Sequence, residues 1–171
     1  MDSLLEELRR ELQAAIEGRT PADLQTAPAG KWNASQILEH LYLTYSHTNK
    51  GIAKCLRTGH PLATPATMVH RVKAFVVVGL GYLPGGAKAP ERAIPTGMPG
   101  DEVRTAIFTE MEQMASGLDE CERKFGPATK IMDHPILGPL TAAQWRKFHS
   151  VHGRHHARQI RERVAVRDGG R

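Results

Sequence analysis

The chain has 171 residues, of which 40% are hydrophobic and 24% are charged, a composition typical of a soluble globular protein. This length suits a single domain, residues 1–171, with one sizeable core. No run approaches the ~18 apolar residues of a membrane-spanning helix, so we expect no membrane partner. The N-terminal residues also lack the basic region and apolar run of a secretory signal. Two cysteines, Cys55 and Cys121, are too few for a disulfide framework. We therefore predict that both are small apolar side chains in a cytoplasmic, bacterial protein.

Histidine is the compositional outlier, because five of the nine histidines lie between residues 134 and 156. Positive charge is concentrated in the same part of the chain: residues 141–171 contain eight Lys or Arg against two acids. A basic stretch of this kind can bind nucleic acid. However, the chain has no recognition motif, and only 5% of its residues are aromatic and able to stack on bases. We expect a solvated cationic face and no nucleic-acid partner.

Hydrophobic spacing predicts five helical stretches and no confident strand. The first helix covers residues 3–16, where leucines three and four positions apart form one apolar stripe. The second begins at Asn33, which forms a capping-box pattern with Gln36, and ends near residue 57 before Gly59. The third covers residues 66–83 and contains a Val-Val-Val run that suits a strand or a buried helix. We favour a helix there, because a lone strand would have no partner.

The loop at residues 84–100 holds four prolines and four glycines, and loops of this length often cover a site or an interface. The fourth helix covers residues 101–125, and a second Pro/Gly-containing loop follows it. Thr141 and Gln144 form another capping-box pattern at the start of the last helix, which we predict to end near Val164. The tail from about residue 167 is expected to be flexible. The predicted fold is all-α: a four-helix bundle with an additional helical segment and a long Pro/Gly-rich loop.

The last helix places its histidines on its apolar face. At about 100° per residue, His152 lies at the centre of the apolar residues, with His149, His156 and Gln159 within about 60° of it. The cations lie more than about 110° away and are expected in water: Arg146, Lys147, Arg154, Arg158 and Arg161. Buried imidazoles need polar partners. His152 and His156, four residues apart, suit two ligands of one metal ion; the alternative is a pair of core histidines held by hydrogen bonds.

A metal site needs a third ligand from another helix. The upstream candidates are His40, His47, His60 and His70. His40 and His47 are seven residues apart on the second helix and share one face, so spacing alone does not choose between them. Glu39 points about 100° away from His40 and is expected to be solvated rather than a general base.

Three segments of the sequence resemble members of the DinB-like superfamily over roughly residues 20–162: KWNASQILEHL, the PGGAKAPE loop and HPILGPLTAAQWRKFHSVHGRHHARQI. These are bacterial helical bundles that include bacillithiol S-transferases and the mycothiol-dependent maleylpyruvate isomerase. The resemblance implies a divalent metal bound by His40, His152 and His156. It leaves His149, His155 and Gln159 as candidates that line the pocket or support the ligands.

Three neutral imidazoles leave a divalent metal with its full charge and an open position, the pattern of catalytic zinc sites. We expect zinc or nickel, although imidazole also suits iron and copper. An open position can bind a thiol as its thiolate or lower the pKa of water. Together with the resemblance, this implies transfer of a low-molecular-weight thiol to an electrophile as the expected function, with a small-molecule substrate of unknown identity. The alternatives are a metal-dependent hydrolase and a non-catalytic metal-binding or interaction protein, and a homodimer is left open.

Overall fold

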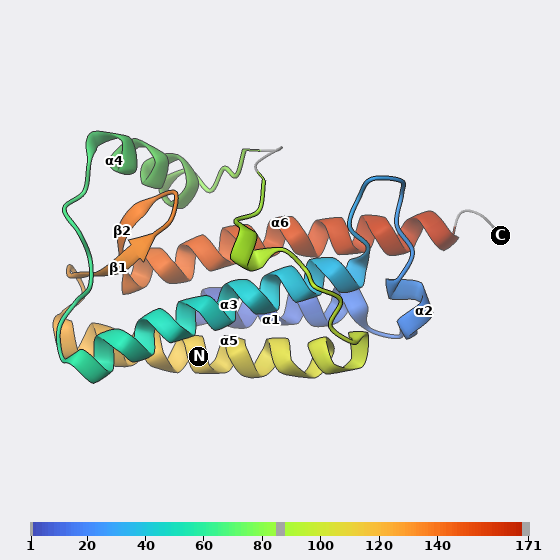
Figure 1. The fold of residues 1–171 in the computed structure, drawn as a ribbon, viewed down its shortest axis with the longest axis horizontal. Coiled ribbons are helices and arrows are strands. Elements are labelled where there is room, and N and C mark those ends of the chain that lie inside the picture. Colours follow the sequence, from blue (N-terminus) through green and yellow to red (C-terminus); the bar gives the residue numbers. More distant parts are fainter. Residues whose placement is uncertain (1, 85–87, 169–171) are drawn as a thin grey trace.

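Four long helices run along the longest axis of the molecule and form a bundle, as the apolar stripes predicted (Figure 1). They are α1 (Ser3–Ile16), α3 (Ala34–Thr58), α5 (Gly100–Phe125) and α6 (Ala142–Asp168). Helix α1 packs mainly against α6, and α3 packs mainly against α5. This computed structural model describes residues 2–84 and 88–168. Among the helices of those residues, none has the length and apolar character needed to cross a membrane.

The helix ends follow the predicted capping signals. Asn33 accepts a hydrogen bond from the backbone N–H of Gln36 at 2.8 Å, and the Gln36 side chain accepts from the N–H of Asn33 at 3.0 Å. Thr141 and Gln144 make the same reciprocal pair before α6. Helix α3 is capped by Gly59, which follows its last residue and has a φ of 77°, a conformation that favours glycine. The predicted starts of these two helices are confirmed.

One short helix and one helix end differ from the prediction. Thr20 and Asp23 form a capping box around a short helix, α2 (Pro21–Leu24), that hydrophobic spacing could not reveal in four residues. Helix α6 continues to Asp168 rather than ending near Val164, because no glycine or proline stops it there. Of the tail expected to be flexible, residues 167 and 168 have helical backbone and residues 169–171 lie outside the described part.

The segment expected as a third helix over residues 66–83 is shorter. It forms α4 (Met68–Ala74) and continues as a π-helical turn, Phe75–Gly79, so a helix rather than a strand is confirmed. It is not a buried helix, because most of its large apolar side chains are exposed, Phe75 among them at 63%. One side of the segment contacts α6 and one strand of the hairpin described next.

The second loop contains a β-hairpin that was not expected. Strand β1 (Lys130–His134) pairs antiparallel with β2 (Gly138–Thr141), with an irregularity between Lys130 and Met132. Three consecutive residues of β2 are buried on both faces, so no period-two alternation marks it. Gly138 has a φ of 71°, and the ring of His70 from α4 lies directly against it, so a side chain there would be strained and would clash.

Part of the cationic face of α6 is packed rather than solvated, which corrects the expectation for two of its five cations. Arg146 is 5% exposed and donates to Asp119 at 2.6 Å and to Glu122 at 2.7 Å, both on α5. Arg154 pairs with Glu7 and Glu11 of α1. The helical wheel missed these contacts because α6 packs against α1, α3 and α5 and so has little free circumference.

The core is continuous between the four long helices. Both cysteines are buried and free, which confirms their prediction as apolar core residues. At Gly153 of α6, an added Cβ would lie 2.6 Å from both methyl carbons of buried Leu8. The missing side chain therefore lets α6 and α1 approach closely.

Candidate metal centre

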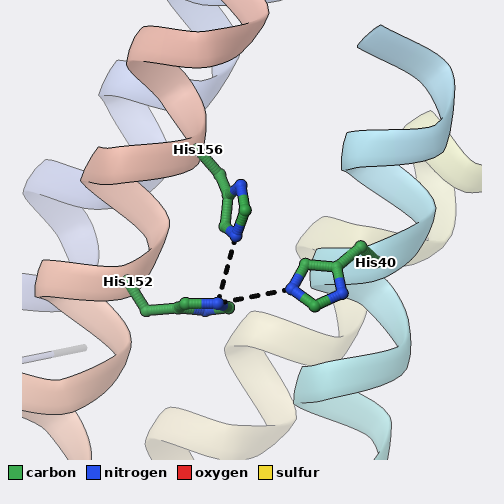
Figure 2. Close-up of side chains that lie close together, drawn as sticks. All are labelled: His40, His152 and His156. Atoms are coloured by element: carbon green, nitrogen blue, oxygen red, sulfur yellow. Dashed lines mark hydrogen bonds between the residues drawn. The ribbon is translucent and has the colours of Figure 1, made fainter. Parts of the chain in front are cut away.

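Three histidine rings from two helices point toward one another (Figure 2). His40 comes from α3, and His152 and His156 come from successive turns of α6. The Nε2 atom of His152 lies 3.3 Å from Nε2 of His40 and 3.1 Å from Nε2 of His156. His40 and His156 are buried and His152 is partly buried. The structure therefore brings together the three histidines that the resemblance implied.

The spacing of these nitrogens suits a metal ion. Nitrogen ligands bound to tetrahedral zinc at 2.0–2.1 Å lie about 3.3 Å from one another. The candidate ligand atoms of the three histidines all lie within 4.8 Å of one another, with the two shorter separations close to that value. Among the described residues, no other group of three or more histidine, cysteine or acidic side chains has this metal-binding geometry.

The proton on His40 is placed by the loop before α5. Its Nδ1 atom lies 2.8 Å from the carbonyl oxygen of Ala93, in a 3₁₀ turn formed by Glu91–Ala93. A carbonyl oxygen only accepts hydrogen bonds, so Nδ1 carries the proton and Nε2 keeps a lone pair. Loops as long as residues 84–100 often cover a site or an interface, and the described part of this loop contacts His40 through Ala93. Metal-binding histidines usually have such a partner on the second nitrogen.

His156 has an equivalent partner in Gln159. Its Nδ1 atom lies 2.8 Å from the Gln159 side-chain oxygen, which leaves the Nε2 lone pair free. His152 differs: its Nδ1 atom is buried without a hydrogen-bond partner, so Nε2 makes all the polar contacts of this ring. Since two of the three Nε2 atoms carry lone pairs and the third has no other role, the cluster fits a divalent transition metal.

Burial keeps the three imidazoles neutral. It lowers the pKa of His40 despite the opposing hydrogen bond to Ala93, and it lowers the pKa of His156 to about 3. Burial and then the neighbouring histidines bring the pKa of His152 well below its usual value. Only the neutral ring has a lone pair for a metal, so these shifts leave the cluster ready to bind near neutral pH.

Glu39 is buried, contrary to the expectation that it is solvated. It is 2% exposed, and its carboxylate accepts hydrogen bonds from the N–H groups of Thr96, Gly97 and Met98 at 2.7–3.0 Å. Burial raises its pKa, but these bonds and one from the Thr96 hydroxyl outweigh that effect and bring the pKa below its usual value. Glu39 therefore holds the loop whose Ala93 contacts His40.

The other candidate histidines lie outside the cluster. His149 is fully buried, with Nε2 3.1 Å from the Thr48 hydroxyl, and burial lowers its pKa to about 3. His155 is partly buried and its ring centre lies 5.2 Å from that of His156. His47, the alternative to His40, bonds through Nδ1 to the carbonyl of Leu43 one turn earlier. His155 and His47 line the cavity described next.

A cavity of about 1130 Å³ opens beside the three histidines. Its walls come from α3, α6, the α4 segment, the hairpin and the loop before α5. Much of the lining is apolar, including Val77, Leu83, Trp145 and Phe148. Cavities of this size bind small molecules.

His134 is a cavity residue that sequence reasoning did not select. It lies at the end of β1, partly buried, and its ring centre is 4.3 Å from that of Phe148. Burial, and secondarily the charge of Arg92, lowers its pKa to about 4. The Asp-His-Pro sequence indicated only a loop. The ring lies in the cavity wall because of the hairpin, which the sequence did not predict.

Comparison with protein families agrees with this architecture. The chain matches the DinB superfamily over residues 4–160, a range that includes α3, α5, most of α1 and α6, and the three clustered histidines. Searches of curated proteins and of solved structures found no match.

Proposed function

Since this chain belongs to the DinB superfamily, we propose that it is a divalent-metal-dependent enzyme that transfers a low-molecular-weight thiol to an electrophilic small molecule. The observation that supports this most is the cluster of His40, His152 and His156, with neutral rings and nitrogens at ligand spacing, on the wall of a cavity. A divalent zinc or nickel ion held there would stabilise a thiolate near neutral pH.

The chain's own residues prepare the site for that chemistry. Ala93 and Gln159 fix the rings of His40 and His156 with their Nε2 lone pairs inward. Trp32 packs on the His40 ring, with ring centres 5.2 Å apart. The apolar part of the lining limits water, which strengthens electrostatic attraction for a thiolate and protects an electrophile from hydrolysis.

The acidic residues favour thiol transfer over hydrolysis. One common form of metal-assisted hydrolysis uses a nearby carboxylate as the general base that accepts a proton from water. Among the described residues that line the cavity, Asp133 is the one acid. Its two carboxylate oxygens accept hydrogen bonds from the N–H and the hydroxyl of Thr64 at 3.0 and 2.6 Å. Glu39 is committed to the loop. A bound thiolate is already a nucleophile and needs no such base.

The test measures thiol transfer with and without metal. Chelator-treated protein, reloaded with one equivalent of zinc or nickel, is assayed with cysteine as the thiol and 1-chloro-2,4-dinitrobenzene as the electrophile. We expect a rate above that of free metal, lost in His152→Ala and kept in His60→Ala, which changes an exposed histidine outside the cluster. Metal binding without a rate increase over a panel of thiols would favour a non-catalytic metal protein.

A further inference from the structure

The hairpin holds His134 in one tautomer. Its Nδ1 atom accepts hydrogen bonds from the backbone N–H groups of Ile136 and Leu137, both at 3.1 Å. An N–H group only donates, so Nδ1 must keep its lone pair and the proton of the neutral ring lies on Nε2. His134 is therefore a hydrogen-bond donor at the ring edge that faces away from the turn.

That donor is available to the cavity. His134 lines the cavity, and within the described residues no protein group bonds to its Nε2 atom. Its ring packs edge-to-face on Phe148, and Phe148 stacks on the candidate ligand His152 with ring centres 5.4 Å apart. One aromatic ring thus separates the free Nε2–H from the histidine cluster, so both can contact one small molecule.

The charge around this donor favours an anion. The lining contains five cations, Lys31, Lys73, Lys88, Arg92 and Arg163, and one acid, Asp133, whose oxygens are already bonded to Thr64. Arg92 lies close enough to His134 to disfavour a second proton on its ring. A neutral N–H donor beside a guanidinium suits a carboxylate or a polarised carbonyl oxygen.

We propose that His134 is a substrate-binding residue whose Nε2–H donates to a carboxylate oxygen of the substrate, with Arg92 supplying the adjacent positive charge. The substrate class is then an organic acid. Its carboxylate and its electrophilic or thiol group are separated by about the thickness of the Phe148 ring, which lies between His134 and His152. This inference rests on the proposed function, because it names the substrate for that same cavity.

The test uses binding rather than turnover, so that its failure differs from a failure of the proposed function. Chelator-treated full-length protein is titrated with succinate and with its neutral diamide, and tryptophan fluorescence reports binding because Trp32 and Trp145 both line the cavity. We expect succinate to bind more tightly than the diamide. Equal binding of the two probes, or binding of neither, would overturn the anion subsite while leaving metal-dependent transfer untouched.

His134→Asn separates the donor from the structural role. The Asn side-chain oxygen can still accept from the N–H groups of residues 136 and 137, as in an Asx turn, but its short amide does not reach the cavity. We expect a thermal midpoint close to that of the wild type and about ten-fold weaker succinate binding, the usual effect of losing a hydrogen bond to a charged group. Unchanged succinate binding in this folded variant would remove His134 from the subsite.

Two further measurements complete the test. Arg92→Gln should weaken succinate binding and leave diamide binding unchanged, whereas Arg71→Gln, an equal charge change at an exposed residue outside the cavity lining, should alter neither. Long-range ¹H–¹⁵N NMR should show the His134 proton on Nε2 and none on Nδ1. A proton on Nδ1, or an equal loss in both arginine variants, would contradict the proposal.

Discussion

The Nδ1 atom of His40 donates a hydrogen bond to the carbonyl oxygen of Ala93 at 2.8 Å, across 53 positions of sequence. This bond joins helix α3 to the loop before α5 and determines which nitrogen of His40 faces the cluster. Glu39, the preceding residue, holds the far side of the same loop. Consecutive residues of α3 therefore position the site in two ways: His40 supplies a candidate ligand, and Glu39 fixes the segment that orients it.

Removing either α6 histidine of the cluster should abolish metal binding. We expect His152→Ala and His156→Ala to lower bound zinc or nickel from near one per chain to near zero, because two nitrogens hold the ion far less well than three. Elemental analysis after dialysis measures this. His60→Ala is the matched control and should keep its metal; full metal content in the double variant would place the site elsewhere.

His40→Ala tests the third ligand against the alternative His47. Metal should raise the thermal midpoint of the wild type, because it binds the folded state, and most of that rise should disappear in His40→Ala. Affinity should fall by more than the ~10–100-fold typical of losing a residue that only supports a ligand.

The matched variant is His47→Ala, which removes a cavity histidine of α3 outside the cluster. It should keep the full metal-dependent rise in thermal midpoint. If His40→Ala and His47→Ala behave in the opposite way, His47 is the third ligand.

Glu39→Gln should weaken the loop and, through Ala93, the metal site. The amide cannot accept the same three backbone N–H bonds with a full negative charge, so we expect a loss of ~1–3 kcal/mol in the free energy of unfolding. Metal affinity should fall about ten-fold because the partner of His40 becomes less ordered. Urea unfolding and zinc titration measure the two effects. The control is Glu17→Gln, at an exposed position. If Glu39→Gln is as stable as this control, other contacts hold the loop.

Acid should destabilise the metal-free protein through its buried histidines. The folded-state pKa of His149 is lowered to about 3, whereas in the unfolded chain it returns to about 6.5. Between those values the unfolded state binds more protons, so stability is full above pH 6.5 and is lost as the pH falls toward 3. Each such histidine contributes at most about 1.4 kcal/mol per pH unit.

His149→Leu removes one of the buried imidazoles that bind a proton when the chain unfolds. Urea midpoints of the chelated protein between pH 7 and pH 4 should therefore vary less steeply in this variant than in the wild type. His60→Leu, at an exposed position, should keep the wild-type slope. A His149→Leu slope equal to that of the wild type would show that His149 does not carry this dependence.

Local patterns determined the long helices and part of the site. Apolar residues three and four positions apart, with capping pairs such as Asn33 and Gln36, identified α1, α3, α5 and α6, because helix formation depends on neighbours within one or two turns. The same periodicity placed His152 and His156 on one face of α6. Residue spacing did not choose between His40 and His47, since helical phase defines a face but not the height at which another helix crosses it.

Only the tertiary structure decided what lies against each face. Glu39 was expected in solvent because it points about 100° away from His40, yet the loop 57–59 positions away donates three backbone N–H groups to it. Arg146 was assigned to water because it lies more than about 110° from the centre of the apolar face of α6, and two carboxylates of α5 cover it. His134 reaches the cavity only because two backbone N–H groups of a hairpin hold its ring. For Glu39 and Arg146 the partner is a backbone or charged group distant in sequence, and periodicity carries no information about such partners because their approach depends on how the elements pack. The partners of His134 are two and three residues away, but its place in the cavity depends on how the hairpin packs against Phe148 of α6.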